Sequence, residues 1–382
     1  MKKGLPGTAF MVSCSVILAS CSSVDMQHAS PPDEALPSVA YRVPKSAEVS
    51  ENQRVVSASH AASVCRRQLE CLAPSFSIIM DYGDSCRGSV SQHMSALAED
   101  MLESGLAVAV SMESRGKKIT FTPVYSDCML MLRAFHEPSF RRTLPPAYQQ
   151  ALNKAVDIVN QVCKLYRSDY ERAVALHDYL ALHCRYDADL GAAAQADATS
   201  KLLLEGRAVC DGYAHAYGML LSMAGIENRF VIGKGDGIEH IWNLVKLDNQ
   251  WVHVDVTYDD PKPDKKGRVL HSYFGIPDSL IANNHSWNRL EVPTANADKL
   301  YYPFYRGYHF STVRDLLTWA SGNRQGHDWN LTVVVDELRT LRSDAAIYRR
   351  VNDAVRYVGS FQLSSIAIDD GLPGTIYCTF SD

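Results

Sequence analysis

The stretch RAVCDGYAHAYGMLLSMAGI, residues 207–226, sets a single cysteine, Cys210, at the start of a helix-forming run. Apolar residues recur there at helical spacing before Gly225 ends the pattern: Val209, Tyr213, Tyr217, Leu220, Leu221 and Ala224. Cys210 is therefore expected at or near a helix N-terminus, where unpaired backbone N–H groups and the helix dipole favour an anion such as a thiolate. Gly206 and Gly212 permit a tight entry turn and the close approach of a substrate backbone.

Two strand-like runs follow the helix, HIWNLVKL at residues 240–247 and QWVHVDVTY at residues 250–258. The two residues between them, Asp248 and Asn249, suit a two-residue hairpin turn. The sequence therefore predicts an antiparallel hairpin in this part of the chain.

The register of this hairpin decides whether a histidine and an aspartate can meet. With a two-residue loop, Trp242 faces Asp255 across the two strands. His240 then lies on the same sheet face as Asp255, one diagonal step away, where long side chains still reach each other. A three-residue loop would instead send His240 and Asp255 to opposite faces of the sheet.

Cys210, His240 and Asp255 supply a thiol, an imidazole and a carboxylate, the three parts of an activated thiol nucleophile. Acyl transfer by a thiol needs a base that holds it as a thiolate and a third group that orients this base. A cysteine at a helix start, taken alone, is more often a small hydrophobe or half of a disulfide. The helix start and the shared hairpin face together favour a catalytic triad.

The run from about Ser168 to Trp287 resembles the core domain of the transglutaminase-like superfamily, a papain-like thiol enzyme fold. The matching pieces are YERAVALHDYLALHCRYD, ATSKLLLEGRAVCDGYAHAYGMLLSMAGI, RFVIG, HIWNLVKLDNQWVHVDVTYDDP, SYFGIPD and NHSWN. The resemblance implies an α+β fold whose papain-like core has an antiparallel sheet and a nucleophile helix. It also implies that Cys210 is the nucleophile, His240 the general base and acid, and Asp255 the orienting carboxylate.

Three further residues match family-typical neighbours of the triad and are interpreted as substrate-binding candidates: Tyr213, Trp242 and Asn243. Acyl transfer also needs hydrogen-bond donors for the oxyanion, and the backbone N–H of Cys210 can supply one. The residues just before it, LLLEGRAV at 202–209, contain no glutamine or asparagine. The sequence therefore does not identify the second donor.

The N-terminal segment, residues 1–20, reads as a secretory signal with Lys2 and Lys3 before the mostly apolar GLPGTAFMVSCSVILAS. The LASC sequence that ends at Cys21 resembles the lipobox of bacterial lipoproteins, which implies lipidation of Cys21 and attachment to a membrane. The alternative is that the signal peptide is cleaved at a nearby bond and that Cys21 carries no lipid. Residues 21–52 are rich in Ser, Pro and Glu and read as a flexible tether. The expected location is the bacterial cell envelope, on the periplasmic face or at the cell surface.

About 330 residues remain, enough for two or three compact units. We expect an N-terminal α+β module at residues 53–140, a catalytic core at 141–310 and a C-terminal α+β module at 311–382. Each module has a strand–helix–strand–strand pattern: FSIIMDY, SVSQHMSALAEDMLESG, LAVAVSM and ITFTPVY, then LTVVVDE, AAIYRRVNDAVRYV, SSIAID and TIYCTFSD. The shared order suggests an internal repeat, although the two sequences are barely similar.

Composition limits the partners and cofactors. The chain has 46% hydrophobic residues and a formal net charge of −5 without a basic block, so no nucleic-acid partner is expected. No phosphate-binding glycine loop is recognisable, and no cofactor is expected. Because the 13 histidines are scattered and no cysteine spacing resembles a zinc motif, no metal site is expected either.

The chain contains 10 cysteines. Setting aside Cys14, Cys21 and Cys210 leaves an odd number, so at least one of the others stays unpaired in an oxidising compartment. Cys65 and Cys71 are close enough in sequence to be a candidate disulfide pair, although spacing does not fix the connectivity.

Helices are also predicted before the nucleophile. One covers about residues 145–166, and the next begins near Ser168 with a capping box formed with Glu171. His177 and Cys184 lie on the apolar face of this second helix and are expected to pack in the core rather than to form a second site.

Two further segments could be functional, but a structural explanation is simpler for both. The aromatic run YYPFYRGYHF, residues 301–310, is expected to cover the edge of the core rather than to line a groove. Asp259 and Asp260 are expected in a solvated turn rather than at a calcium ion.

These patterns together predict an extracytoplasmic thiol enzyme that acts on amide bonds of a peptide or protein. Hydrolysis is favoured over crosslinking because water is always available and nothing in the sequence specifies an amine acceptor. Two alternatives stay open: a non-catalytic cell-envelope scaffold or binding lipoprotein that keeps the fold, and an enzyme that acts on peptidoglycan stem peptides. The sequence does not indicate an oligomeric state.

Overall fold

The structure is a computed structural model, and all the residues that it describes belong to one compact unit. They are residues 52–70, 72–81, 97, 107–115, 117–190, 197–260, 268–290, 292–323, 325, 327–341, 343–358, 362–369 and 371–381. The expected signal peptide, Cys21 and all of the tether except Asn52 lie outside the described residues. So does the predicted helix at 89–105, except Leu97, which is helical and buried.

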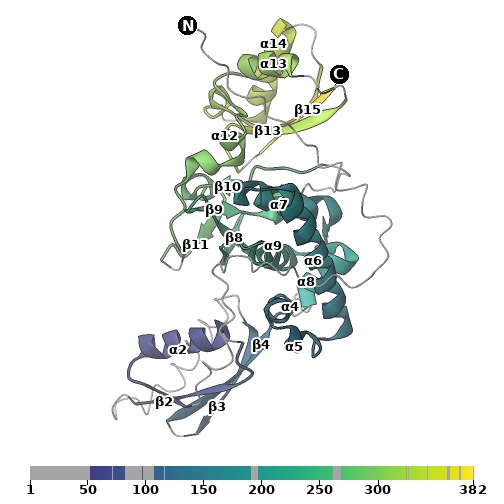
Figure 1. The fold of residues 1–382 in the computed structure, drawn as a ribbon. Coiled ribbons are helices and arrows are strands. Elements are labelled where there is room, and N and C mark those ends of the chain that lie inside the picture. Colours follow the sequence, from purple (N-terminus) through teal and green to yellow (C-terminus); the bar gives the residue numbers. More distant parts are fainter. Residues whose placement is uncertain are drawn as a thin grey trace, which may run out of the picture. The chain divides into compact units, whose positions relative to one another are not determined.

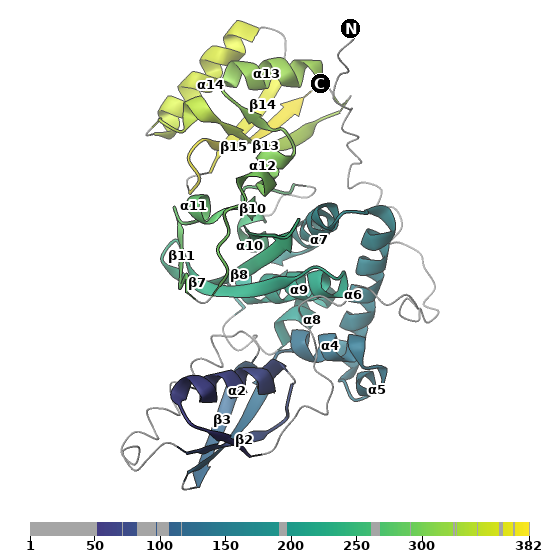
Figure 2. The same ribbon diagram turned by 60° about the vertical axis from the view of Figure 1, so that its left-hand side comes forward.

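The core is an antiparallel sheet with helices packed on one side (Figures 1 and 2). Its strands run in the order β10-β9-β8-β7-β11: β7 (Asn228–Gly235), β8 (Ile238–Leu247), β9 (Gln250–Val254), β10 (Phe274–Ile276) and β11 (His285–Trp287). The helices are α6 (Pro146–Leu165), α7 (Asp169–His183), α8 (Ala198–Glu205) and α9 (Cys210–Met223). This arrangement confirms the predicted α+β core with an antiparallel sheet and a nucleophile helix.

Helix α9 is central to this core. Every residue from Gly212 to Met223 is buried except Ser222, as expected for a helix that is covered all round. Gly212 permits the close packing, because a Cβ there would lie 2.4 Å from the Cβ of Ala208 and 3.1 Å from the carbonyl oxygen of Ala198. The first turn of α9 is therefore packed closely against Ala198 and Ala208, which precede it in the chain.

The chain enters α9 through a tight turn. Gly206 ends α8 with φ 71°, a left-handed conformation that glycine adopts readily. The next two residues form β6 (Arg207–Ala208), which pairs in parallel with β5 (Arg185–Tyr186). This pairing places the segment after α7 beside the start of α9.

The β8–β9 hairpin has the register that the sequence predicts. Leu247 pairs with Gln250, and the loop residues Asp248 and Asn249 have φ values of 49° and 61°, as a two-residue hairpin turn requires. Strand β9 stops at Val254, so that Asp255 becomes the N-cap of the short helix α10 (Val256–Asp259).

Two four-stranded sheets precede and follow the core in sequence. The first contains β1 (Gln53–Val55), β2 (Phe76–Met80), β3 (Ala107–Arg115) and β4 (Lys118–Tyr125), with α2 (Ala58–Glu70) between β1 and β2. The second contains β12 (His309–Phe310), β13 (Trp329–Val335), β14 (Gln362–Ile368) and β15 (Thr375–Ser381), with α13 (Val313–Gly322) and α14 (Asp344–Val358) between its first three strands.

The two sheets share one topology. Their orders, β1-β2-β4-β3 and β12-β13-β15-β14, both place the first strand parallel to the second and the fourth strand between the second and third. The sequence predicts the last three strands of each set. It misses β1 and β12 because they have only 3 and 2 residues, too short to show an alternating pattern.

Several smaller elements complete the description. They are α4 (Asp127–His136), α5 (Pro138–Arg141), α11 (Asp278–Ile281), α12 (Tyr302–Tyr305) and the 3₁₀ turns η4 (Asp298–Leu300) and η5 (Asp336–Leu338). Helix α4 packs into the core cluster that also holds α6 and α9.

In the aromatic run Tyr301 and Tyr308 are buried and Tyr305 stacks on Tyr170, with ring centroids 3.6 Å apart, which is the packing that we expected. Of the described helices, none is both long and apolar enough to span a bilayer.

Two local expectations need correction. Asp259 and Asp260 do not lie in a solvated turn; both are buried, because core groups donate hydrogen bonds to their carboxylates. Ser168 accepts the backbone N–H of Glu171 at 3.2 Å as predicted, but the Glu171 carboxylate does not close the capping box. It forms a two-point ion pair with Arg306 instead, with both distances 2.9 Å.

Candidate active site

Cys210 is the first residue of α9, as predicted. Its N-cap residue, Val209, has no side chain that could accept the first backbone N–H groups, and no described group accepts the N–H of Cys210. The thiol is partly exposed, whereas Cys128, Cys184 and Cys378 carry free thiols that are buried. Among these four cysteines, Cys210 alone combines a helix start with access from outside.

His240 lies between the thiol and the carboxylate. Its Nε2 is 2.7 Å from Oδ2 of Asp255, and the same ring lies close enough to Cys210 for the thiol to raise its pKa. Burial disfavours the charged imidazole, but Asp255 and Cys210 outweigh it and raise the pKa of His240 to about 10. The imidazole is therefore held as a cation beside the thiol, which favours a thiolate–imidazolium pair.

Asp255 is a buried carboxylate with four N–H donors. Its Oδ1 accepts the backbone N–H groups of Thr257 and Tyr258 at 3.0 and 3.2 Å. Its Oδ2 accepts Nε2–H of His240 and Nε2–H of His285 at 2.7 and 3.1 Å. Burial works against the charge, yet the imidazoles and their hydrogen bonds hold the pKa of Asp255 well below its usual range.

The three substrate-binding candidates are buried in the protein interior and are not exposed beside the triad. Tyr213, Trp242 and Asn243 have 0%, 1% and 1% of their surface exposed. Their polar groups are also used internally, since Tyr213 donates to Asp260, Trp242 to Nδ1 of His253, and Asn243 to the carbonyl of Ala214. This burial favours a supporting role over direct contact with a substrate.

Tyr186 is a site residue that the sequence reasoning missed. Its backbone N–H donates to Asp260 at 3.2 Å, and it pairs with Ala208 across the short β5–β6 ladder. Burial raises the pKa of Tyr186, and so does the nearby Cys210, which places the phenol within electrostatic reach of the thiol. No spacing in the sequence could reveal this proximity, because it depends on the pairing of β5 with β6 after the turn at Gly206.

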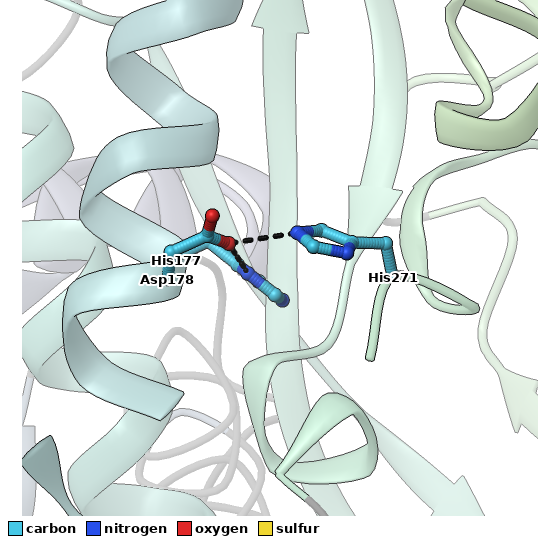
Figure 3. Close-up of side chains that lie close together, drawn as sticks. All are labelled: His177, Asp178 and His271. Atoms are coloured by element: carbon cyan, nitrogen blue, oxygen red, sulfur yellow. Dashed lines mark hydrogen bonds and ion pairs between the residues drawn. The ribbon is translucent and has the colours of Figure 1, made fainter. Parts of the chain in front are cut away.

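A second cluster joins α7 to His271, which follows α10 in sequence (Figure 3). Asp178 Oδ1 lies 2.9 Å from Nδ1 of His177 and 2.8 Å from Nε2 of His271. Nε2 of His177 is 3.1 Å from Asp259. Burial opposes the charge of His177, but the hydrogen bonds with the two aspartates raise its pKa to about 9.

The side chains of both clusters are close enough to coordinate a metal ion: His177, Asp178 and His271 in one, His240, Asp255 and His285 in the other. In each cluster, however, imidazole nitrogens already meet a carboxylate oxygen at hydrogen-bond distance. In the first cluster the buried His177 imidazolium is stabilised by the carboxylates of Asp178 and Asp259. His177 therefore packs in the core, as expected, but carries a charge there. The second contains two of the predicted triad residues, His240 and Asp255.

Comparison with known proteins agrees with this geometry. A family model of the transglutaminase-like superfamily matches residues 156–256. A peptide-N(4)-(N-acetyl-beta-glucosaminyl)asparagine amidase of Caenorhabditis briggsae is 45% identical over 58 residues, which cover 15% of this chain and 9% of that protein. A kyphoscoliosis peptidase of Mus musculus is 26% identical over 161 residues, which cover 36% of this chain and 24% of that protein. The chain thus spans no more than 24% of the length of either relative.

Solved structures also align with the chain. A structure described as a TGase shares 14% identity over 54% of this chain and 59% of its own, with a TM-score of 0.26. A putative cysteine protease from Cytophaga hutchinsonii shares 14% identity over 39% of this chain and 61% of its own, with a TM-score of 0.25. On the family match and on the geometry of Cys210, His240 and Asp255, residues 156–256 belong to the transglutaminase-like superfamily.

Proposed function

We propose that this protein is a thiol enzyme that cleaves amide bonds of a peptide or protein through a covalent acyl-enzyme. One observation carries the proposal: the buried His240 bonds Asp255 through Nε2 and interacts electrostatically with the partly exposed Cys210 at the start of α9. A non-catalytic scaffold does not need all three groups in this order. The names of the two relatives, an amidase and a peptidase, add support for chemistry at an amide bond.

In the first half of the proposed reaction, the Cys210 thiolate attacks the substrate carbonyl carbon and forms a C–S bond. The carbonyl oxygen becomes an oxyanion, for which the backbone N–H of Cys210 is one donor and the Tyr186 hydroxyl is our candidate for the second. The C–N bond then breaks as the His240 imidazolium gives its proton to the leaving amine. Asp255 holds the ring in place throughout this exchange.

In the second half, neutral His240 takes a proton from the incoming nucleophile, which attacks the thioester and releases Cys210. Water as the nucleophile gives hydrolysis, and a primary amine gives transfer. We propose hydrolysis as the main outcome because no described side chain beside the triad marks a site for an amine.

We also propose that the enzyme works outside the cytoplasm, anchored by lipid on Cys21. The support is the LASC sequence after an apolar segment. Replacing Cys21 by serine should move the protein from the membrane fraction to the soluble fraction of the envelope, as followed by immunoblot. A Cys14→Ser variant is the control, and membrane retention of the Cys21→Ser protein would refute the anchor.

Alkylation tests the nucleophile directly. Iodoacetamide at about pH 6 should label Cys210 much faster than an ordinary thiol, because a thiolate–imidazolium pair persists where free thiols are protonated. Peptide mapping by mass spectrometry gives the site. The matched comparison is Cys163, a partly exposed free thiol whose pKa is raised by burial, and it should label slowly. Equal rates at the two cysteines would count against the enzyme.

Peptide cleavage should vanish in Cys210→Ala and persist in Cys163→Ala. The measurement is the release of new amino groups from a peptide library, with and without an added primary amine. A product that incorporates the amine would assign transfer. Undiminished release of amines by Cys210→Ala would place the chemistry elsewhere in the molecule.

Asp255→Asn should narrow the pH range of activity. The wild-type imidazolium persists at neutral pH and is lost as pH rises through about 10, because Asp255 raises the pKa of His240. Without the carboxylate, only Cys210 still opposes the effect of burial, and the proton should leave His240 at a much lower pH than in the wild type. At neutral pH we expect kcat/KM to fall by at least about 100-fold. An unchanged alkaline limb in the pH profile would show that Asp255 does not control His240.

Tyr186→Phe tests the second oxyanion donor. Loss of one such donor should lower kcat by about 10²-fold with little change in KM, since the hydroxyl acts only on the oxyanion. The rate of Cys210 alkylation should stay near the wild-type rate, because no oxyanion forms in that reaction. A change in KM alone would assign Tyr186 to substrate binding.

A further inference from the structure

The catalytic carboxylate has a second histidine that the sequence reasoning did not select. Nε2 of His285 lies 3.1 Å from the same Asp255 oxygen that receives His240. The His285 side chain is completely buried, and its ring centroid is 5.7 Å from that of His240. Since Asp255 is an anion, Nε2 of His285 must carry the proton of this hydrogen bond.

Strand β7 makes this contact geometrically possible. His285 belongs to β11, which pairs with β7, whereas His240 belongs to β8 on the opposite edge of β7. Residues facing both histidines along β7 are glycines: Gly233 pairs with His240, and Gly235 pairs with His285. With no side chain at either position, His285 can reach across β7 to the carboxylate.

These glycines have no room for a side chain. A Cβ on Gly233 would lie 2.1 Å from the carbonyl oxygen of Ser286 and 3.1 Å from the indole of Trp242. A Cβ on Gly235 would lie 2.6 Å from the hydroxyl of Tyr258. The face of β7 at Gly233 and Gly235 is thus covered by Ser286, Trp242 and Tyr258.

The orientation of the second histidine is itself fixed. Nδ1 of His285 is 2.7 Å from the side-chain amide of Asn284, and the same amide forms a hydrogen bond with the hydroxyl of Tyr273 at 2.8 Å. The ring is therefore held at both nitrogens, between Asn284 and Asp255. These two contacts fix the direction in which the ring points.

We propose that His285 is a positioning residue that acts on His240 through Asp255 and sets how strongly the carboxylate holds the imidazole proton. This inference rests on the proposed function, because it assigns a task within the same reaction. A carboxylate with four N–H donors is a weaker base than one with three. His285 thus keeps His240 acidic enough to give its proton to the leaving amine.

The direction of the pH shift caused by replacing His285 distinguishes this role from a merely structural one. In His285→Phe the carboxylate loses a donor, becomes more basic and binds the His240 proton more strongly. The alkaline limit at which His240 loses its proton should then rise by about one pH unit, while amide turnover falls about tenfold. General loosening of the site would do the opposite and lower this limit toward the pKa of an ordinary imidazole.

The test is the pH dependence of Cys210 alkylation by iodoacetate, measured on the full chain by mass spectrometry. This readout needs no substrate, so it stays informative even if peptide cleavage is never found. The reaction with this anionic reagent slows when the His240 cation is lost, so we expect the alkaline limb to move up in His285→Phe and to return to the wild-type position in His285→Gln, whose amide can still donate. kcat for a peptide amide should fall more than kcat for an activated ester, whose leaving group needs little protonation.

The matched control is His253→Gln. His253 is equally buried in the same sheet and bonds Asp278 through Nε2 at 2.8 Å, without touching Asp255. Its alkaline limb should stay at the wild-type position. If His285→Phe does not fold, Asn284→Ala, which frees only the far side of the His285 ring, should shift the limb in the same direction by less. An unmoved alkaline limb, or one that moves down, in the folded variants would overturn the proposal for His285.

Discussion

The burial of one carboxylate charge is the constraint on which the site depends. Asp255 is 1% exposed, and a charge so far from water is tolerated only where hydrogen-bond donors replace the water. Its four donors come from three places: the first turn of α10, strand β8 and strand β11. The order of the sheet is therefore part of what holds this charge, because β11 must lie beside β7 for the fourth donor to reach Asp255.

The triad could be predicted from sequence because its geometry follows from local rules. A helix start fixes Cys210, and a two-residue loop at Asp248 and Asn249 fixes the face shared by His240 and Asp255. Helical periodicity and hairpin register each act over a few residues, so one sequence is enough to read them.

The other site residues depend on long-range pairing. His285 reaches Asp255 only through the β7–β11 ladder, and Tyr186 reaches Cys210 only through the two-residue ladder of β5 and β6. Neither ladder has an alternating pattern long enough to be recognised in the sequence. The burial of Asp259 was missed for a related reason, since its partner His177 lies 82 residues earlier in the chain.

The bare backbone of β7 at Gly233 and Gly235 has a consequence for mutational tolerance. Glycine in a strand is usually a weak choice, and replacing it with a β-branched residue would ordinarily improve the strand. At Gly233 even a single methyl group would collide with the backbone carbonyl of Ser286, so any other amino acid would push β11 away from the acid. At Gly235 the obstacle is the end of the Tyr258 side chain, which would have to move away. Two residues with no functional group of their own thus restrict the packing around Asp255.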